Sequence, residues 1–140
     1  MIIKKLRDYG FNTDNRTYVI AEIGINHRGN IKVAKQLIDS AVRAGVDAVK
    51  FQTYLTEKRA PKGNKEVFKI LKDLELPFEA FKELKKYAEQ CHVDFFSTPF
   101  DKESIKYLES IETNLYKIAS FDVVNRKLLS EVAKTGKPVI

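Results

Sequence analysis

Apolar positions recur along the chain in two periods, and together they predict a repeated order of strand and helix. Short apolar runs with strand character alternate with longer runs in which apolar residues return every three or four positions, as on one face of a helix. The predicted strands are residues 17–23, 47–52, 93–97, 115–119 and 138–140. The predicted helices are residues 31–44, 65–74, 77–90, 102–110 and 125–135. Strict alternation with short connections is typical of parallel βα units.

The segment from residue 53 to residue 64 interrupts this order. It contains Pro61 and Gly63 and has no clear periodicity, which predicts a loop. Loops at strand ends often carry binding residues, so we expect this one to approach a substrate. Tyr54 and Arg59 lie within it, and their side chains are equally compatible with substrate contact and with exposure to solvent.

Units of about 25 to 45 residues suit an α/β protein of the TIM-type (β/α)8 barrel class. The rival is a doubly wound open sheet, but the chain has neither the GxGxxG nor the GxxxxGKS phosphate loop. We expect an N-terminal hairpin or extension at residues 1–16. Residues 17–140 would then form the amino-terminal half of the barrel, namely the first four βα units and the start of strand 5.

Residue parity predicts which polar side chains share the barrel interior, because side chains of a strand point alternately to its two faces. In the second strand, Val49 and Phe51 would pack against the helices, and this turns Lys50 and Gln52 to the inner face. Applied to the other strands, the same argument gives five side chains that converge at one mouth: Glu22, Lys50, Gln52, Thr98 and Lys117.

Two lysines in one cavity need partners, because burying an unpaired lysine costs several kcal/mol. Glu22 can neutralise one lysine, and a phosphate or carboxylate of a ligand would satisfy the remaining charge. The alternative is a purely structural ion pair between Glu22 and Lys50 at the barrel rim. The further presence of Lys117 at the same mouth favours an anion-binding site.

Two polar residues, Asn26 and His27, follow the first strand directly. The amide of Asn26 suits either a turn or a ligand. Judged from spacing alone, His27 fits a satisfied loop histidine better than a catalyst.

The net charge of +6 comes from 25 basic and 19 acidic residues. Lys82 and Lys85 alternate with Glu83 and Glu89, which is the usual pattern of a solvated helix face. No recognition motif for nucleic acid accompanies the charge, so we expect no nucleic-acid partner.

The chain has one cysteine, Cys91, so no disulfide within the chain is possible and a reducing compartment is expected. His27 and His92 are the only histidines and are too far apart to argue for a zinc cluster. There is no secretory signal and no apolar stretch near the roughly 18 residues of a membrane helix. We therefore expect a cytoplasmic protein with no membrane association.

Four strand-end motifs follow one another: AEIGINHRGN at residues 21–30, VKFQT at 49–53, FFSTPFD at 95–101 and YKIAS at 116–120. In this order and spacing the chain resembles the amino-terminal half of the sialic acid (N-acetylneuraminate) synthase family. The resemblance covers residues 18 to 140, and four motifs in register are more specific than any one alone.

The resemblance implies a (β/α)8 enzyme that condenses phosphoenolpyruvate with N-acetylmannosamine or a related amino sugar, giving a nine-carbon 2-keto acid and phosphate. Glu22 and Lys50 would be catalytic, with Glu22 near the reacting carbons. Asn26 and His27 would shape the site. The implied phosphoenolpyruvate ligands are Lys50, Gln52, Thr98, Lys117 and Ser120.

The resemblance further implies a divalent metal, Mn or Mg, with ligands beyond residue 140 and none in this chain. It also implies a homodimer, and it leaves the acceptor sugar open. We expect the chain to be part of a longer protein and the isolated chain to be inactive. Two alternatives stay open: a truncated, non-catalytic half-barrel that binds an anion or a partner, and another phosphoenolpyruvate-using barrel such as a keto-acid phosphate synthase.

Overall fold

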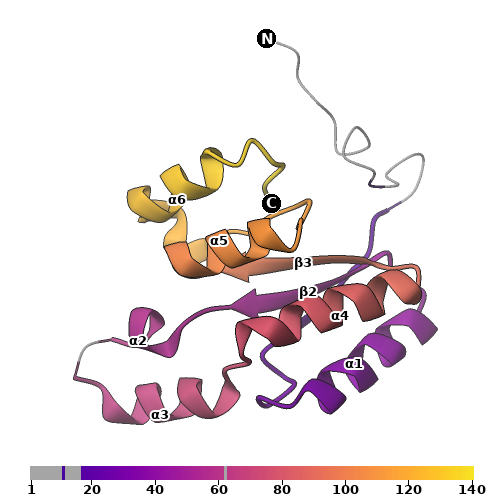
Figure 1. The fold of residues 1–140 in the computed structure, drawn as a ribbon, viewed down its shortest axis with the longest axis horizontal. Helices are drawn as coiled ribbons and strands as arrows, with labels where there is room; N and C mark the ends of the chain where they lie inside the picture. Colours follow the sequence, from indigo (N-terminus) through magenta and orange to yellow (C-terminus); the bar gives the residue numbers. More distant parts are fainter. Residues whose placement is uncertain (1–10, 12–16, 62) are drawn as a thin grey trace.

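The computed structural model describes residues 11, 17–61 and 63–140. A parallel sheet lies at its centre (Figure 1), with the strand order β1 (Ile20–Gly24), β2 (Ala48–Thr53) and β3 (Asp94–Pro99). The order in the sheet is the order in the chain, as consecutive βα units require. The predicted α/β class with parallel strands is confirmed.

Helices separate the strands and pack on the sheet. α1 packs against β1 and α4, and α5 packs against β3 and α6. Two helices are inserted between β2 and α4, and Figure 1 shows them beyond the arrowhead of β2. The helices are α1 (Ile31–Arg43), α2 (Thr56–Arg59), α3 (Lys65–Leu74), α4 (Phe78–Gln90), α5 (Lys102–Ser110) and α6 (Arg126–Ala133), with a 3-10 helix η2 (Ser120–Val124) before α6.

Polar caps begin most of these helices. A side-chain oxygen accepts backbone N–H groups of the first turn, which otherwise lack partners. The helices α1, α3, α5 and α6 are capped in this way by Asn30, Asn64, Asp101 and Asn125. The turns that lead from a helix to the next extended segment contain a residue with positive φ: Gly45, His92, Glu112 and Gly136.

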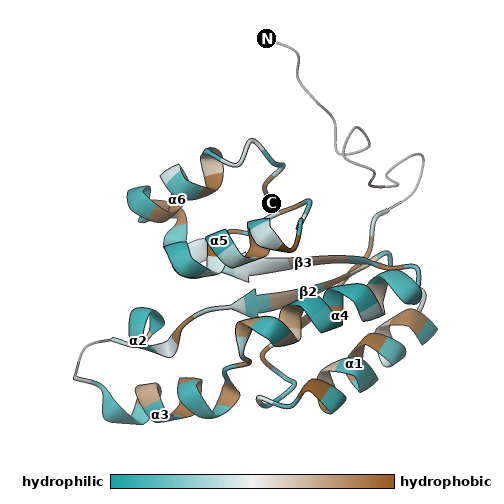
Figure 2. Ribbon diagram, in the orientation of Figure 1, coloured by the Kyte–Doolittle hydropathy of each residue, from teal (hydrophilic) through white to brown (hydrophobic). Residues whose placement is uncertain are grey.

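The two faces of the sheet are apolar but differ in what covers them. Val49 and Phe51 belong to the core between sheet and helices. Ala48 and Phe96 point to the opposite face, where they pack with Phe11. The predicted alternation along β2 is therefore confirmed. Figure 2 shows β2 changing from hydrophobic to hydrophilic toward its arrowhead.

The predicted strands 115–119 and 138–140 are wrong as full strands. Tyr116 forms single parallel bridges with Ser97 and with Val139, and neither segment has strand structure beyond them. The carbonyl of Pro138 accepts the amide of Tyr116 at 3.1 Å, but Pro138 has no N–H group to donate, so the pairing cannot extend toward residue 114. The predicted order is nevertheless kept, since the first segment lies beside β3 and the second lies beside the first.

The predicted loop 53–64 contains the four-residue helix α2, and the 3-10 helix η2 was not predicted at all. The expected N-terminal hairpin at residues 1–16 lies outside the described residues, apart from Phe11, which is buried.

Candidate functional site

The side chains of Glu22 on β1 and Thr98 on β3 both contact the ammonium group of Lys50 on β2. Glu22 and Lys50 are register partners on β1 and β2. The Nζ atom of Lys50 lies 2.5 Å from Oε2 of Glu22 and donates a hydrogen bond of 3.1 Å to Oγ1 of Thr98 on β3. Lys50 and Thr98 are buried, whereas the Glu22 side chain is 54% exposed. The predicted convergence of these three residues is present.

Gln52 joins this group through a gap that Gly24 leaves open. The pairing of β1 with β2 shifts register between Glu22 and Gly24, and Gly24 has a φ of +58°. A Cβ atom at residue 24 would lie 3.0 Å from Oε1 of Glu22 and 3.4 Å from Nε2 of Gln52. Oε1 of Gln52 is buried without a hydrogen-bond partner among the described residues. The absence of a Cβ at this bulge thus leaves room for both side chains beside the backbone of Gly24.

Lys117 and Ser120 are not brought into this contact network. The Nζ atom of Lys117 donates a hydrogen bond of 2.7 Å to the carbonyl of Ile118, next to it in the chain. Ser120 is exposed at the first position of η2. Lys117 follows the bridge residue Tyr116 and its amide donates to the Ser97 carbonyl, so its backbone is nevertheless fastened beside β3.

Asp122 was not among the predicted site residues, yet its side chain is buried. Oδ1 accepts a hydrogen bond of 3.1 Å from Nδ2 of Asn125, and Oδ2 has no partner among the described residues. A buried carboxylate with an unused oxygen is costly unless something pairs with it. The only signal in the sequence was its place three residues after the end of the fourth predicted strand.

His27 faces the helices and not the Lys50 cluster. It is 1% exposed and stacks on Phe51 with ring centroids 6.0 Å apart. Its Nδ1 accepts the amide of Gly29 at 3.2 Å, which places the proton of the neutral ring on Nε2. Burial lowers the pKa of His27 to about 4, and the Gly24 backbone offsets part of that lowering. His27 is therefore neutral near pH 7 and supports the loop that carries Gly29.

Asn26 holds the same turn. Its Nδ2 donates a hydrogen bond of 2.9 Å to the carbonyl of Ile23, and the residue is otherwise exposed. This geometry is the turn-forming use of an asparagine amide.

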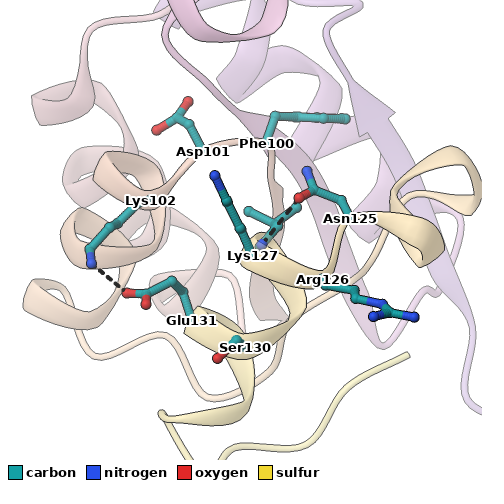
Figure 3. A pocket seen from close by; sticks show the side chains of 9 residues that line it. Phe100, Asp101, Lys102, Asn125, Arg126, Lys127, Ser130 and Glu131 are labelled. Atoms are coloured by element: carbon teal, nitrogen blue, oxygen red, sulfur yellow. Dashed lines mark hydrogen bonds and ion pairs between the residues drawn. The ribbon is translucent and has the colours of Figure 1, made fainter.

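A cavity of about 530 Å³, whose lining does not include Lys50, lies between the end of β3 and the start of α6 (Figure 3). Its lining includes the cations Lys102, Arg126 and Lys127. Lys102 is paired with Glu131 at 2.9 Å, so part of this charge is already satisfied. We place the chemistry at Lys50 and not in this cavity, because the ammonium of Lys50 is buried, has a carboxylate partner and lies on a central strand of the sheet.

Around Lys50, charge and burial favour an anion. A buried ammonium held by one exposed carboxylate and one hydroxyl keeps donor capacity for a further acceptor. Within the described residues no three His, Cys, Asp or Glu side chains gather as a metal site would need. In the described part of the chain, no helix is long and apolar enough to cross a membrane.

Parallel βα units with polar groups converging at one edge of the sheet place the chain in the α/β class, whose functional sites typically lie at that edge. The particular family follows from sequence comparison. A model of the NeuB family matches residues 37–140, and the chain belongs to this family.

Similar proteins agree with this assignment. The chain is 43% identical over 136 residues to an uncharacterized protein of Methanocaldococcus jannaschii, covering 97% of this chain and 40% of that protein. It is 36% identical over 138 residues to an N,N'-diacetyllegionaminic acid synthase of Campylobacter jejuni, covering 89% of this chain and 41% of the synthase. The chain thus spans about two fifths of the length of these relatives.

Solved structures support the fold. A sialic acid synthetase from Leptospira borgpetersenii, solved in complex with citrate, superposes with a TM-score of 0.86 at 38% identity and covers 89% of this chain and 44% of that one. A 3-deoxy-D-arabino-heptulosonate 7-phosphate synthase from Thermotoga maritima superposes with a TM-score of 0.63 at 14% identity, covering 89% of this chain and 39% of that one, and shows likeness of fold alone. These neighbours are TIM-barrel synthases, so the chain has the fold of part of such a barrel.

Proposed function

We propose that this chain is part of a synthase that condenses phosphoenolpyruvate with N-acetylmannosamine or a related N-acetylated amino sugar. The products would be a nonulosonic acid, which is a nine-carbon 2-keto acid, and inorganic phosphate. The observation that carries the proposal is the buried Lys50, paired with Glu22 and Thr98 in a chain of the NeuB family. Relatives named as legionaminic and pseudaminic acid synthases support the same reaction type.

The charge balance at Lys50 suits phosphoenolpyruvate. The substrate carries a phosphate and a carboxylate, and a dry ammonium is a strong donor to either. Lys50 and Thr98 would hold one anionic group, and the amide Nε2 of Gln52 would donate a hydrogen bond to the other. Lys117 and Ser120 would complete the phosphoenolpyruvate ligands once Lys117 releases the Ile118 carbonyl.

Glu22 would act near the reacting carbons. In the proposed condensation, C3 of phosphoenolpyruvate bonds to the aldehyde carbon of the sugar, and C2 becomes electron-poor. Water then adds at C2, and phosphate leaves. A preorganised carboxylate stabilises developing positive charge, and Glu22 is the exposed carboxylate beside Lys50. Lys50 would meanwhile stabilise the negative groups of the same molecule.

The remaining parts of the proposal concern the longer protein. A divalent metal, Mn or Mg, would polarise the sugar aldehyde when bound. Its ligands would lie outside this chain. We propose a homodimeric, cytoplasmic enzyme, and we propose that the 140-residue chain alone is inactive.

The test is release of phosphate by the full-length protein incubated with phosphoenolpyruvate, Mn²⁺ and one acceptor sugar at a time. We expect release that depends on both substrates, and we expect none from residues 1–140 alone. Release without an acceptor, or from no member of a panel of N-acetylated sugars, would contradict the proposal. Specific binding of phosphoenolpyruvate with no turnover would instead favour a non-catalytic anion-binding protein.

A further inference from the structure

The guanidinium group of Arg59 lies against two aromatic rings from different parts of the fold. Its Cζ atom lies 3.9 Å from the ring centroid of Phe100 and 4.4 Å from that of Tyr54. Arg59 ends α2, Tyr54 follows β2 and Phe100 follows β3. Arg59 therefore links the segment that follows β2 to the segment that follows β3.

The two rings are themselves fixed. Tyr54 is 2% exposed, and its hydroxyl donates a hydrogen bond of 2.9 Å to the carbonyl of Leu71 in α3. Tyr54 meets Phe100 edge to face, with centroids 6.3 Å apart. Phe100 stacks on Phe121 of η2 at 5.8 Å. The row Tyr54–Arg59–Phe100–Phe121, called the aromatic clamp below, links the chain segments that follow β2, β3 and the bridge at Tyr116.

Arg59 is bound mainly by these rings. Its Nη1 atom is buried without a hydrogen-bond acceptor among the described residues. Burial lowers the pKa of Arg59, while Tyr54 and Asp122 oppose the lowering, and an arginine keeps its charge in any protein environment. A planar guanidinium stacks on ring faces in a way that the compact ammonium of lysine does not reproduce.

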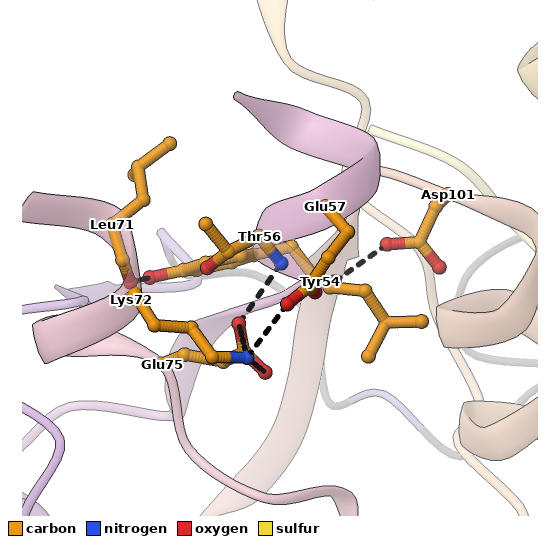
Figure 4. A network of polar contacts seen from close by, with 8 residues as sticks. Tyr54, Thr56, Glu57, Leu71, Lys72, Glu75 and Asp101 are labelled. Carbon is orange, nitrogen blue, oxygen red and sulfur yellow. Dashed lines mark hydrogen bonds and ion pairs between the residues drawn. The ribbon is translucent and has the colours of Figure 1, made fainter. Parts of the chain in front are cut away.

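Polar contacts fasten the segment before Arg59 as well (Figure 4). The amide of Leu55 donates to Oδ2 of Asp101 at 2.8 Å, and that of Thr56 donates to Oε2 of Glu75 at 2.9 Å. These bonds tie the segment to the start of α5 and to the end of α3. From this segment, Arg59 contacts Phe100, and Phe100 in turn stacks on Phe121 of η2.

The aromatic clamp lies at the outer side of the mouth, and its rings are apolar. Tyr54 follows Thr53, the last residue of β2, so the clamp is farther out than Lys50 and Gln52. Its end ring, Phe121, is 65% exposed, which leaves an apolar face in the open. Such a face suits the C–H groups and acetamido methyl of a sugar better than it suits a phosphate.

We propose that Arg59 is a positioning residue for the acceptor sugar: through the aromatic clamp it holds the segment after β2 and the Phe100–Phe121 pair as one wall of the acceptor subsite. This inference rests on the synthase function proposed above. Arg59 itself need not touch the sugar. Loss of the clamp should loosen the wall and weaken acceptor binding while the phosphoenolpyruvate site at Lys50 stays intact.

The test compares Arg59→Met, Arg59→Lys and the control Lys58→Met in the full-length protein. Lys58 is an exposed cation next to Arg59 in α2. We expect Arg59→Met to raise the KM for the acceptor about tenfold or more and to leave the KM for phosphoenolpyruvate within about twofold. Arg59→Lys should recover only part of the loss, and Lys58→Met should match the wild type.

Hydrogen exchange gives a readout that does not depend on activity. The amides of Leu55 and Thr56 should exchange faster in Arg59→Met than in Lys58→Met, while amides of β2 stay protected. Unchanged exchange, or equal changes in both KM values, would overturn the positioning role. If the wild type turns over no acceptor, the synthase function and the acceptor role fail together, and faster exchange would then report the clamp as a purely structural device.

Discussion

The ammonium of Lys50 lies 2.5 Å from the carboxylate of Glu22, yet only the lysine is shielded from water. The Lys50 side chain is 8% exposed and that of Glu22 is 54% exposed. An exposed carboxylate can turn toward solvent or substrate at little cost, whereas a buried ammonium then needs another anion. Lys50 thus stays in place, whereas an anionic ligand can replace Glu22 as its partner. A binding site for an anion requires this combination.

Replacing Lys50 by methionine should weaken binding of phosphoenolpyruvate to the full-length protein by about 10- to 100-fold, since a hydrogen bond to a charged group contributes about 1.5–3 kcal/mol. Methionine keeps the length and the apolar stem. Isothermal titration without acceptor measures the effect directly.

Lys35→Met is the matched control, because Lys35 also pairs with a glutamate, Glu83, at 2.6 Å, but joins two helices on the outer surface. It should leave phosphoenolpyruvate binding unchanged. Equal affinities for the Lys50 and Lys35 variants would remove Lys50 from the binding site.

Gly29→Ala should destabilise the protein more than Gly45→Ala. Both glycines have positive φ, which costs about 1 kcal/mol for alanine. A Cβ at residue 29 would also lie 2.6 Å from the carbonyl oxygen of Asp73, whereas nothing lies within 4 Å at residue 45. We expect a loss of about 3 kcal/mol at Gly29 and about 1 kcal/mol at Gly45, measured by urea unfolding. Equal losses would mean that the loop after β1 can move away from α3.

His27 should make the folded state sensitive to acid. Its pKa is about 4 when folded, against 6.5 for the free side chain, so the unfolded chain binds the proton more tightly. The stabilisation is complete above pH 6.5 and is lost as pH falls toward 4, a change of about 3 kcal/mol. In His27→Gln, the free energy of unfolding should depend less steeply on pH in this window. An unchanged slope would show that other groups cause the acid sensitivity.

Asp101→Ala should cost more stability than the comparable cap removal Asn64→Ala. Asn64 accepts one amide, that of Val67, and is exposed, so its loss should cost about 1 kcal/mol. Asp101 is buried and accepts the amides of both Ser104 and Leu55, so we expect about 3 kcal/mol. Thermal unfolding of the two variants measures the difference. Similar losses would show that the bond to Leu55 contributes nothing.

Periodicity predicted the parts of the fold that are set by burial on one face. The helices at residues 65–74 and 102–110 were predicted with the bounds that the structure has. Parity along β2 correctly placed Lys50 and Val49 on different faces of the sheet. The face that packs against the helices is apolar, so the charged side chain must lie on the other face.

Periodicity could not predict the short or irregular elements. The helix α2 has four residues and too few apolar positions to show a period, so its segment was interpreted as a loop. The sequence left open whether Arg59 contacts substrate or solvent. Its actual partner, Phe100, lies 41 positions away in the chain, and no local pattern indicates that contact. The buried, unpartnered Oδ2 of Asp122 could not be predicted for the same reason, because segments far away in the sequence bury it.

The order of strands in the sheet has a consequence for synthesis of the protein. Each new strand pairs with the one made just before it, so β1 and β2 can associate before β3 has left the ribosome. The newest strand always has one edge free, and the next unit to emerge pairs with it. We therefore expect assembly from the amino terminus onward, in which a pause in translation after α4 would find a two-stranded intermediate that already holds Glu22 against Lys50.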